Sequence, residues 1–112
     1  MTKIECILRP DRISEVSKIL GSLGIKGMTV TEVIGCGLQK GHIRDDWNTE
    51  FKINLLPKTK IEMVVSDSMV DDVVNAVIKI SRTGEIGDGK IFTYPLGNAI
   101  RIRTGETGED AI

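Results

Sequence analysis

The chain has 112 residues, of which 40% are hydrophobic and 28% charged, and its formal net charge is −1. A near-neutral charge and few aromatic residues argue against a nucleic-acid binder, which normally has a basic surface and often stacking rings. The length suits one domain with its own core, so we expect residues 1–112 to form a single domain. The charged, alternating start predicts no signal peptide, and no apolar run is long enough to cross a bilayer. We therefore expect a cytoplasmic protein without direct membrane insertion.

Apolar residues recur in patterns that change along the chain. Strands are predicted where apolar and polar residues alternate or β-branched residues dominate, and helices where apolar residues recur every three or four positions. Pro10, Gly24 and Gly84 are expected to end the runs that precede them. In chain order the predicted elements are a strand over 3–9, a helix over 11–23, a strand over 27–34, a strand over 60–65, a helix capped by Ser66 or Asp67 and running to Arg82, and strands over 90–94 and 99–103. This order predicts an α+β, ferredoxin-like βαβ-βαβ sandwich, an antiparallel sheet with two helices on one face.

The two cysteines, Cys6 and Cys36, lack the paired spacing of a zinc site or a redox motif. Cys6 shares a predicted strand face with Ile4 and Leu8, so burial as a small hydrophobe is expected. Cys36 lies between two glycines, where a small core residue suits a tight backbone. A reactive thiol is the alternative for Cys36.

The segment from Thr83 to Lys90 contains three glycines, two acidic residues and a lysine. Glycine lets backbone amides approach an anion closely, and a lysine adds a point charge, so a phosphate cradle is one interpretation. The other is a helix C-cap at Gly84 followed by a glycine turn into a strand. These residues alone do not decide between the two.

The connection from Leu38 to Pro57 is much longer than the roughly four to six residues usual in compact domains. It is mostly charged and polar, and it carries two large aromatic residues, Trp47 and Phe51, without an obvious core to join. We interpret it as an arm that docks on a partner or closes on a ligand. The alternative is a β-hairpin extension used for subunit packing.

Several stretches carry a more specific pattern: residues 27–33, 35–42, 56–58, 83–92 and 100–106. In this order and spacing they closely resemble the PII nitrogen-regulatory signalling proteins, and the likeness runs from end to end. The resemblance implies a homotrimer of ferredoxin-like subunits that binds ATP or ADP in clefts between subunits. It also implies a non-catalytic sensor that regulates nitrogen-related transporters or enzymes through a T-loop at about residues 38–56.

The resemblance also implies a set of binding residues. For the nucleotide these are Ile7, Thr29, Gly35, Gly37, Leu38, Gln39, Glu62, Val64, Gly87, Asp88, Gly89, Lys90, Arg101 and Arg103. Arg101 and Arg103 would project from one face of a strand and, with Lys90, bring three cations to one polyphosphate. A solvated sheet face is the alternative for the two arginines. Gln39, Lys58 and Gly87 would hold 2-oxoglutarate, with Gln39 ligating a Mg²⁺ ion that bridges this acid to ATP.

Three positions depart from the family pattern. Phe51 stands where many bacterial members carry a tyrosine that is uridylylated, so that modification is predicted absent. Thr49 falls at a serine that cyanobacterial relatives phosphorylate; a plain polar loop residue is the alternative there. Leu38 replaces an arginine that commonly touches the phosphates, which is expected to weaken or reshape ATP/ADP discrimination.

The expected partner contacts are made by Arg44, Asp45, Asp46, Trp47, Thr49 and Phe51. The partner would be a transporter, such as an ammonium channel or an ABC transporter, or a nitrogen-assimilation enzyme. With a transporter as its target, the protein would lie peripherally at the membrane.

Two other classes of function compete with this one. His42 is the only histidine, and an ATP-dependent phosphotransferase would use it as the phosphoryl carrier. Against this, no Gly-Lys-Ser/Thr signature and no acidic pair beside a nucleophile can be identified, so we expect no catalytic residues. The third class is a structural trimer without a ligand, which predicts no nucleotide affinity.

Overall fold

The computed structural model describes residues 1–38 and 53–112. Its strands and α-helices are β1 (Thr2–Leu8), α1 (Ile13–Ser22), β2 (Thr29–Leu38), β3 (Ile53–Val65), α2 (Val70–Ser81) and β4 (Gly89–Pro95). Short 3₁₀ helices occupy Pro10–Arg12, Asp67–Met69 and Gly108–Ala111. Within the described ranges, no helix combines the length and the apolar character that a membrane crossing needs.

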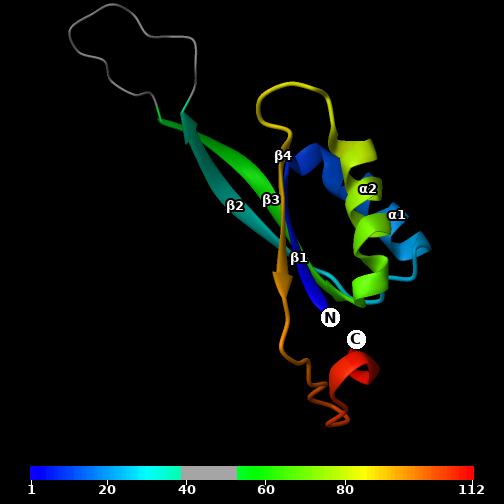
Figure 1. Cartoon of the computed structure of the whole chain (residues 1–112). Helices are drawn as coiled ribbons and strands as arrows, with labels where there is room; N and C mark the ends of the chain where they lie inside the picture. The colour runs from blue at the N-terminus through cyan, green and yellow to red at the C-terminus, as the bar shows by residue number, and fades with distance from the viewer. Residues whose placement is uncertain (39–52) are drawn as a thin grey trace, which may run out of the picture.

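The four strands form one antiparallel sheet in the order β2-β3-β1-β4. β1 is central: its first residue, Thr2, lies opposite Val65 of β3 and Pro95 of β4. Both helices cover the same face of this sheet (Figure 1). The predicted ferredoxin-like α+β fold is therefore confirmed.

The core lies between the sheet and the two helices. Alternate residues of β1 face the helices, and the antiparallel register places alternate residues of β3 beside them. The buried apolar residues are Ile4, Cys6, Leu8, Val16, Leu20, Ile61, Met63, Val65, Val73 and Val77. Burying a large aliphatic side chain contributes about 1.5–3 kcal/mol, so this one layer supplies most of the driving force for folding.

The two cysteines have opposite environments. Cys6 is fully buried, and burial, assisted by the nearby charge of Glu5, raises the pKa of its thiol to about 12. Cys36 lies on β2 and is exposed, so its predicted place in the core is wrong. The reason is that β2 is an edge strand and its residue 36 lies beyond the end of β1 and of the helix layer.

We expect an aromatic disulfide reagent to modify Cys36 of the folded protein and to spare Cys6, because only a solvent-accessible thiolate reacts. The released chromophore would report about one fast thiol per chain in buffer and both thiols in denaturant. The Cys36→Ser variant should lose the fast phase. Fast modification in that variant would contradict the burial of Cys6.

β3 is longer than predicted, because it begins at Ile53 instead of residue 60. Beyond the last β1 pair, Leu8 with Thr59, strands β2 and β3 continue as a two-stranded ribbon (Figure 1). Pro57 is tolerated there because β3 has a neighbour on one side only. A hairpin extension, the alternative interpretation of the long connection, is thus present up to residues 38 and 53.

The predicted strand over 99–103 is wrong. This segment forms a single bridge, between Ile100 and Thr107, and then turns. The Gly105 N–H donates to the Arg101 carbonyl over 2.7 Å, and Gly105 has a φ of 71°, which favours glycine. The turn closes the segment on itself instead of adding it to the sheet.

The predicted helix cap also differs. The Ser66 hydroxyl donates to the Glu109 carboxylate and makes no capping hydrogen bond. The Asp67 carboxylate accepts from the Thr2 hydroxyl over 2.7 Å and lies 3.1 Å from the N-terminal ammonium. These donors lower the pKa of Asp67, and the Thr2 hydroxyl has the largest effect. Both polar side chains therefore link segments that are distant in sequence.

Candidate functional site

The glycine loop, residues 83–89, connects α2 to β4 and lies at the end of β1. Gly84, Gly87 and Gly89 have φ values of 87°, 102° and 109°, the region that favours glycine. At Gly89 an added Cβ would lie 1.8 Å from the Ile7 carbonyl oxygen, so no side chain fits. The close approach of β4 to β1 therefore fixes where the loop ends.

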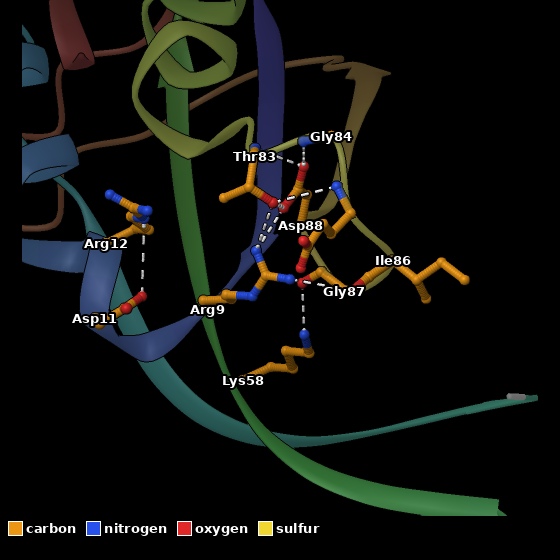
Figure 2. Close-up of polar contacts among 10 residues, drawn as sticks. Arg9, Asp11, Arg12, Lys58, Thr83, Gly84, Ile86, Gly87 and Asp88 are labelled. Carbon is orange, nitrogen blue, oxygen red and sulfur yellow. Dashed lines mark hydrogen bonds and ion pairs between the residues drawn. The ribbon is translucent and has the colours of Figure 1, made fainter.

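The Asp88 carboxylate points into this loop (Figure 2). It accepts hydrogen bonds from the backbone N–H groups of Thr83 and Gly84 over 2.8 and 2.9 Å. The Thr83 hydroxyl and the Arg9 guanidinium also donate to it. These hydrogen bonds hold the pKa of Asp88 well below its usual range, and the one from the Thr83 hydroxyl has the largest effect. Two amides of the predicted phosphate cradle are thus already bound to the chain's own carboxylate.

Two cations from other elements bind the same loop. Arg9, just after β1, donates through Nη2 to the Ile86 carbonyl oxygen over 3.0 Å. Lys58, in the ribbon, donates through Nζ to the Gly87 carbonyl oxygen over 2.7 Å (Figure 2). A Cβ added to Gly87 would lie 3.2 Å from Arg9 Nη2 and 3.5 Å from Lys58 Nζ. The loop, the end of β1 and the ribbon therefore meet at Gly87.

Several of the predicted residues gather around this loop. Lys90 follows Gly89, is exposed and lies opposite Ile7 in the β1–β4 register. Gly35 of β2 leaves room for the Lys58 stem, because an added Cβ would lie 3.1 Å from Lys58 Cγ. We call Ile7, Gly35, Lys58, Gly87, Asp88, Gly89 and Lys90 the loop group.

A second group lies at the other end of β1, around a cavity of about 700 Å³. Its predicted members are Thr29, Glu62, Val64 and Arg101, which we call the cavity group. The Lys60 and Lys3 ammonium nitrogens lie 3.3 and 3.5 Å from Glu62 Oε1. These contacts lower the pKa of Glu62, and the Lys60 hydrogen bond has the largest effect. Arg101 Nη1 lies 2.8 Å from Glu106 Oε1.

Arg101 and Arg103 do not share a strand face, because the predicted strand is a turn. Arg103 is exposed and is not among the residues that line the cavity. One cationic side chain, Arg101, therefore belongs to the cavity group.

The two groups are separated within one chain. Lys3 lines the cavity, whereas Ile7 lies beside the glycine loop. Four residues of extended strand span about 14 Å, so the two groups lie at opposite ends of β1.

Part of the predicted site lies outside the described residues. This applies to Gln39, His42, Arg44, Asp45, Asp46, Trp47, Thr49 and Phe51. Gly37 and Leu38 end β2, where the ribbon leads into residues 39–52. Among the residues that are described, no cluster of three or more His, Cys, Asp or Glu side chains is arranged to hold a metal ion.

Sequence reasoning missed Arg9. Its contacts with Thr83, Ile86 and Asp88 join residues more than seventy positions apart. The available signal was its place directly before Pro10, at the end of a predicted strand.

The chain matches known proteins over its whole length. The family model described as "Nitrogen regulatory protein P-II" matches residues 1–106. Proteins of that name from Haemophilus influenzae and Cereibacter sphaeroides are 50% and 51% identical over 112 residues, covering 100% of this chain and of each relative.

Solved structures give the same result. A B. subtilis GlnK structure has a TM-score of 0.84 at 41% identity, covering 99% of this chain and 97% of that chain. A B. subtilis GlnK-ATP complex has a TM-score of 0.86 at 39% identity, with 99% and 94% covered. An Arabidopsis thaliana PII bound to citrate has a TM-score of 0.81 at 44% identity, with 99% and 91% covered.

The chain belongs to the P-II nitrogen regulatory protein family. It is a regulatory signalling protein and not an enzyme, which decides against the phosphotransferase alternative for His42.

Proposed function

We propose that the protein senses ATP and ADP in clefts between the protomers of a homotrimer. The observation that carries this proposal is the separation of the loop group from the cavity group on one chain. A cleft between two protomers brings the loop group of one against the cavity group of the next. Neither group alone offers both a base-sized cavity and a glycine loop with a cation.

The chemistry of each group suits a different part of a nucleotide. The cavity is partly apolar, lined by residues such as Met28 and Val64, and its volume is in the range of small-molecule sites. It fits a base and a ribose. Lys90 and the amides of Gly87 and Gly89 suit the phosphates, and Arg101 of the neighbouring protomer adds a planar guanidinium. The relative described as a GlnK-ATP complex supports ATP as the ligand.

The sheet offers a surface for assembly. The face without helices carries exposed apolar side chains, among them Leu56, Phe92 and Tyr94, with exposed fractions of 48%, 43% and 42%. Such a surface on a small chain indicates contact with another protomer. It supports the trimer that the family resemblance implies.

We further propose that 2-oxoglutarate binds beside ATP, held by Lys58, Gly87 and Gln39, with Gln39 ligating a Mg²⁺ ion. The Lys58 ammonium donates a hydrogen bond to the Gly87 carbonyl oxygen, so an incoming carboxylate would compete for that donor. A related plant protein is bound to citrate, another acid with several carboxylates.

The output would pass through residues of about 38–56 to a nitrogen-related transporter or enzyme. The proposed contacts are Arg44, Asp45, Asp46, Trp47, Thr49 and Phe51. A cytoplasmic protein, peripheral at the membrane with a transporter as target, follows from this proposal.

Isothermal titration calorimetry tests the nucleotide site. We expect ATP and ADP each to saturate at about one nucleotide per protomer, and GTP, which shares the phosphates but not the base, to bind at least about tenfold more weakly. Light scattering on the same sample should give the mass of a trimer. A monomeric mass, or no heat with ATP and ADP, would overturn the proposal and favour the ligand-free alternative.

A further inference from the structure

Asp88 presents a problem for a phosphate site, because a carboxylate beside a polyphosphate repels it. The structure shows how the loop avoids this. The Asp88 carboxylate points into the loop and accepts hydrogen bonds from four donors: two backbone amides, the Thr83 hydroxyl and the Arg9 guanidinium (Figure 2). Its charge is compensated inside the loop.

Arg9 connects this carboxylate to the rest of the fold. Its guanidinium forks between Asp88 on Nη1 and the Ile86 carbonyl on Nη2. The side chains of Arg9 and Asp88 are 27% and 22% exposed, so the pair is largely shielded from water. A shielded ion pair with further hydrogen bonds is stronger than a surface pair.

We propose that Arg9 and Asp88 are a positioning pair: together they hold the 83–89 loop in the shape that binds phosphate, and neither side chain contacts the nucleotide. This inference rests on the proposed nucleotide site. It changes the role implied for Asp88 from a ligand-contacting residue to one that acts through the loop backbone.

A competing role for Asp88 makes the opposite prediction. If its carboxylate merely occupied amides that phosphate must take over, removing its charge would strengthen nucleotide binding. The geometry favours positioning, because displacing Asp88 would release four hydrogen bonds and leave the carboxylate close to the incoming anion.

The test is a double-mutant cycle on ATP affinity with Arg9→Met, Asp88→Asn and the double variant. We expect each single variant to weaken ATP binding about tenfold and the double variant to be no weaker than either, because both remove one shared interaction. Arg82→Met is the matched control, since it removes the same charge one residue before the loop. It should change the affinity by less than about twofold.

Two further measurements separate positioning from general destabilisation. Hydrogen exchange should speed up at the Thr83 and Gly84 amides of Asp88→Asn and stay unchanged at the β1 and β3 amides. Arg9→Lys keeps the charge but not the fork, so it should recover only part of the affinity. If Arg9→Met does not fold, Arg9→Lys with Asp88→Asn provides the cycle.

The outcomes are distinct. Tighter ATP binding by Asp88→Asn, or additive losses of about a hundredfold in the double variant, would overturn the positioning pair while the nucleotide site stands. Absence of ATP binding by the unsubstituted protein would instead overturn the proposed function itself, and the positioning pair with it.

Discussion

Gly89→Ala is expected to unfold the protein or to lower its free energy of unfolding by at least about 3 kcal/mol. The new Cβ would sit 1.8 Å from the Ile7 carbonyl oxygen, an atom of the central strand. Relief requires β4 to separate from β1, which breaks the ladder that places Lys90. Urea unfolding followed by circular dichroism would measure the loss.

Two alanine substitutions separate the causes. Gly84 shares the positive φ, at 87°, but has open space around its Cβ position, so Gly84→Ala should cost about 1 kcal/mol from backbone strain alone. Gly97 has open space and no positive φ, so Gly97→Ala should lie within about 0.5 kcal/mol of the parent. Equal stability of the Gly89 and Gly97 variants would refute the close approach of β4 to β1.

The fold could be predicted because its core depends on local patterns. The alternation of Ile4, Cys6 and Leu8 has the period of a strand with one buried face, and the helix spacings match a helix layer above it. The segment around Ile100 and Ile102 has the same local appearance but no neighbouring strand, and Ile102 is 99% exposed. Strand propensity without a partner does not make a strand.

The ribbon of β2 and β3 shows the opposite case, a strand that the local sequence does not predict. Residues 53–57 contain Pro57 and lie next to polar residues, so the sequence suggests a loop. The β2 register runs from Thr29 with Glu62 to Leu38 with Ile53, and this continuous pairing extends β3 despite the proline. Information of this kind lies in pairing between strands, which a single-sequence pattern does not contain.

The residue types of the candidate site could be predicted from the sequence better than the arrangement of their side chains. The glycines and Lys90 were identified from composition and resemblance, since positive φ and a nearby cation have a clear sequence signal. The orientation of Asp88 toward Thr83 and Arg9 had none, because it depends on contacts across the fold. The role of a charged side chain is set by its partners, which only the structure identifies.

In the proposed trimer, mixing two variants is expected to restore the nucleotide affinity that each variant alone has lost. Lys90→Ala removes the proposed phosphate-binding lysine of the loop group, and Arg101→Ala removes the proposed phosphate-binding arginine of the cavity group. Each homotrimer should bind ATP at least about tenfold more weakly, because a charge-assisted contact with phosphate is lost in every cleft.

If the clefts lie between protomers, refolding the two variants together produces some clefts that contain both Lys90 and Arg101. A cleft is intact when its loop group comes from an Arg101→Ala chain and its cavity group from a Lys90→Ala chain. Random assembly makes about a quarter of the clefts intact, so calorimetry should detect that fraction of sites with the affinity of the parent protein. A double variant refolded alone is the control and should recover none.

The same experiment tests where the site is located. If one chain formed the whole site, every protomer in the mixture would lack one cation, and no high-affinity sites would return. Different affinity tags on the two variants would verify that mixed trimers have formed. No recovery in such verified trimers would contradict the shared cleft, whereas recovery near a quarter would require that Lys90 and Arg101 act on one nucleotide from different protomers.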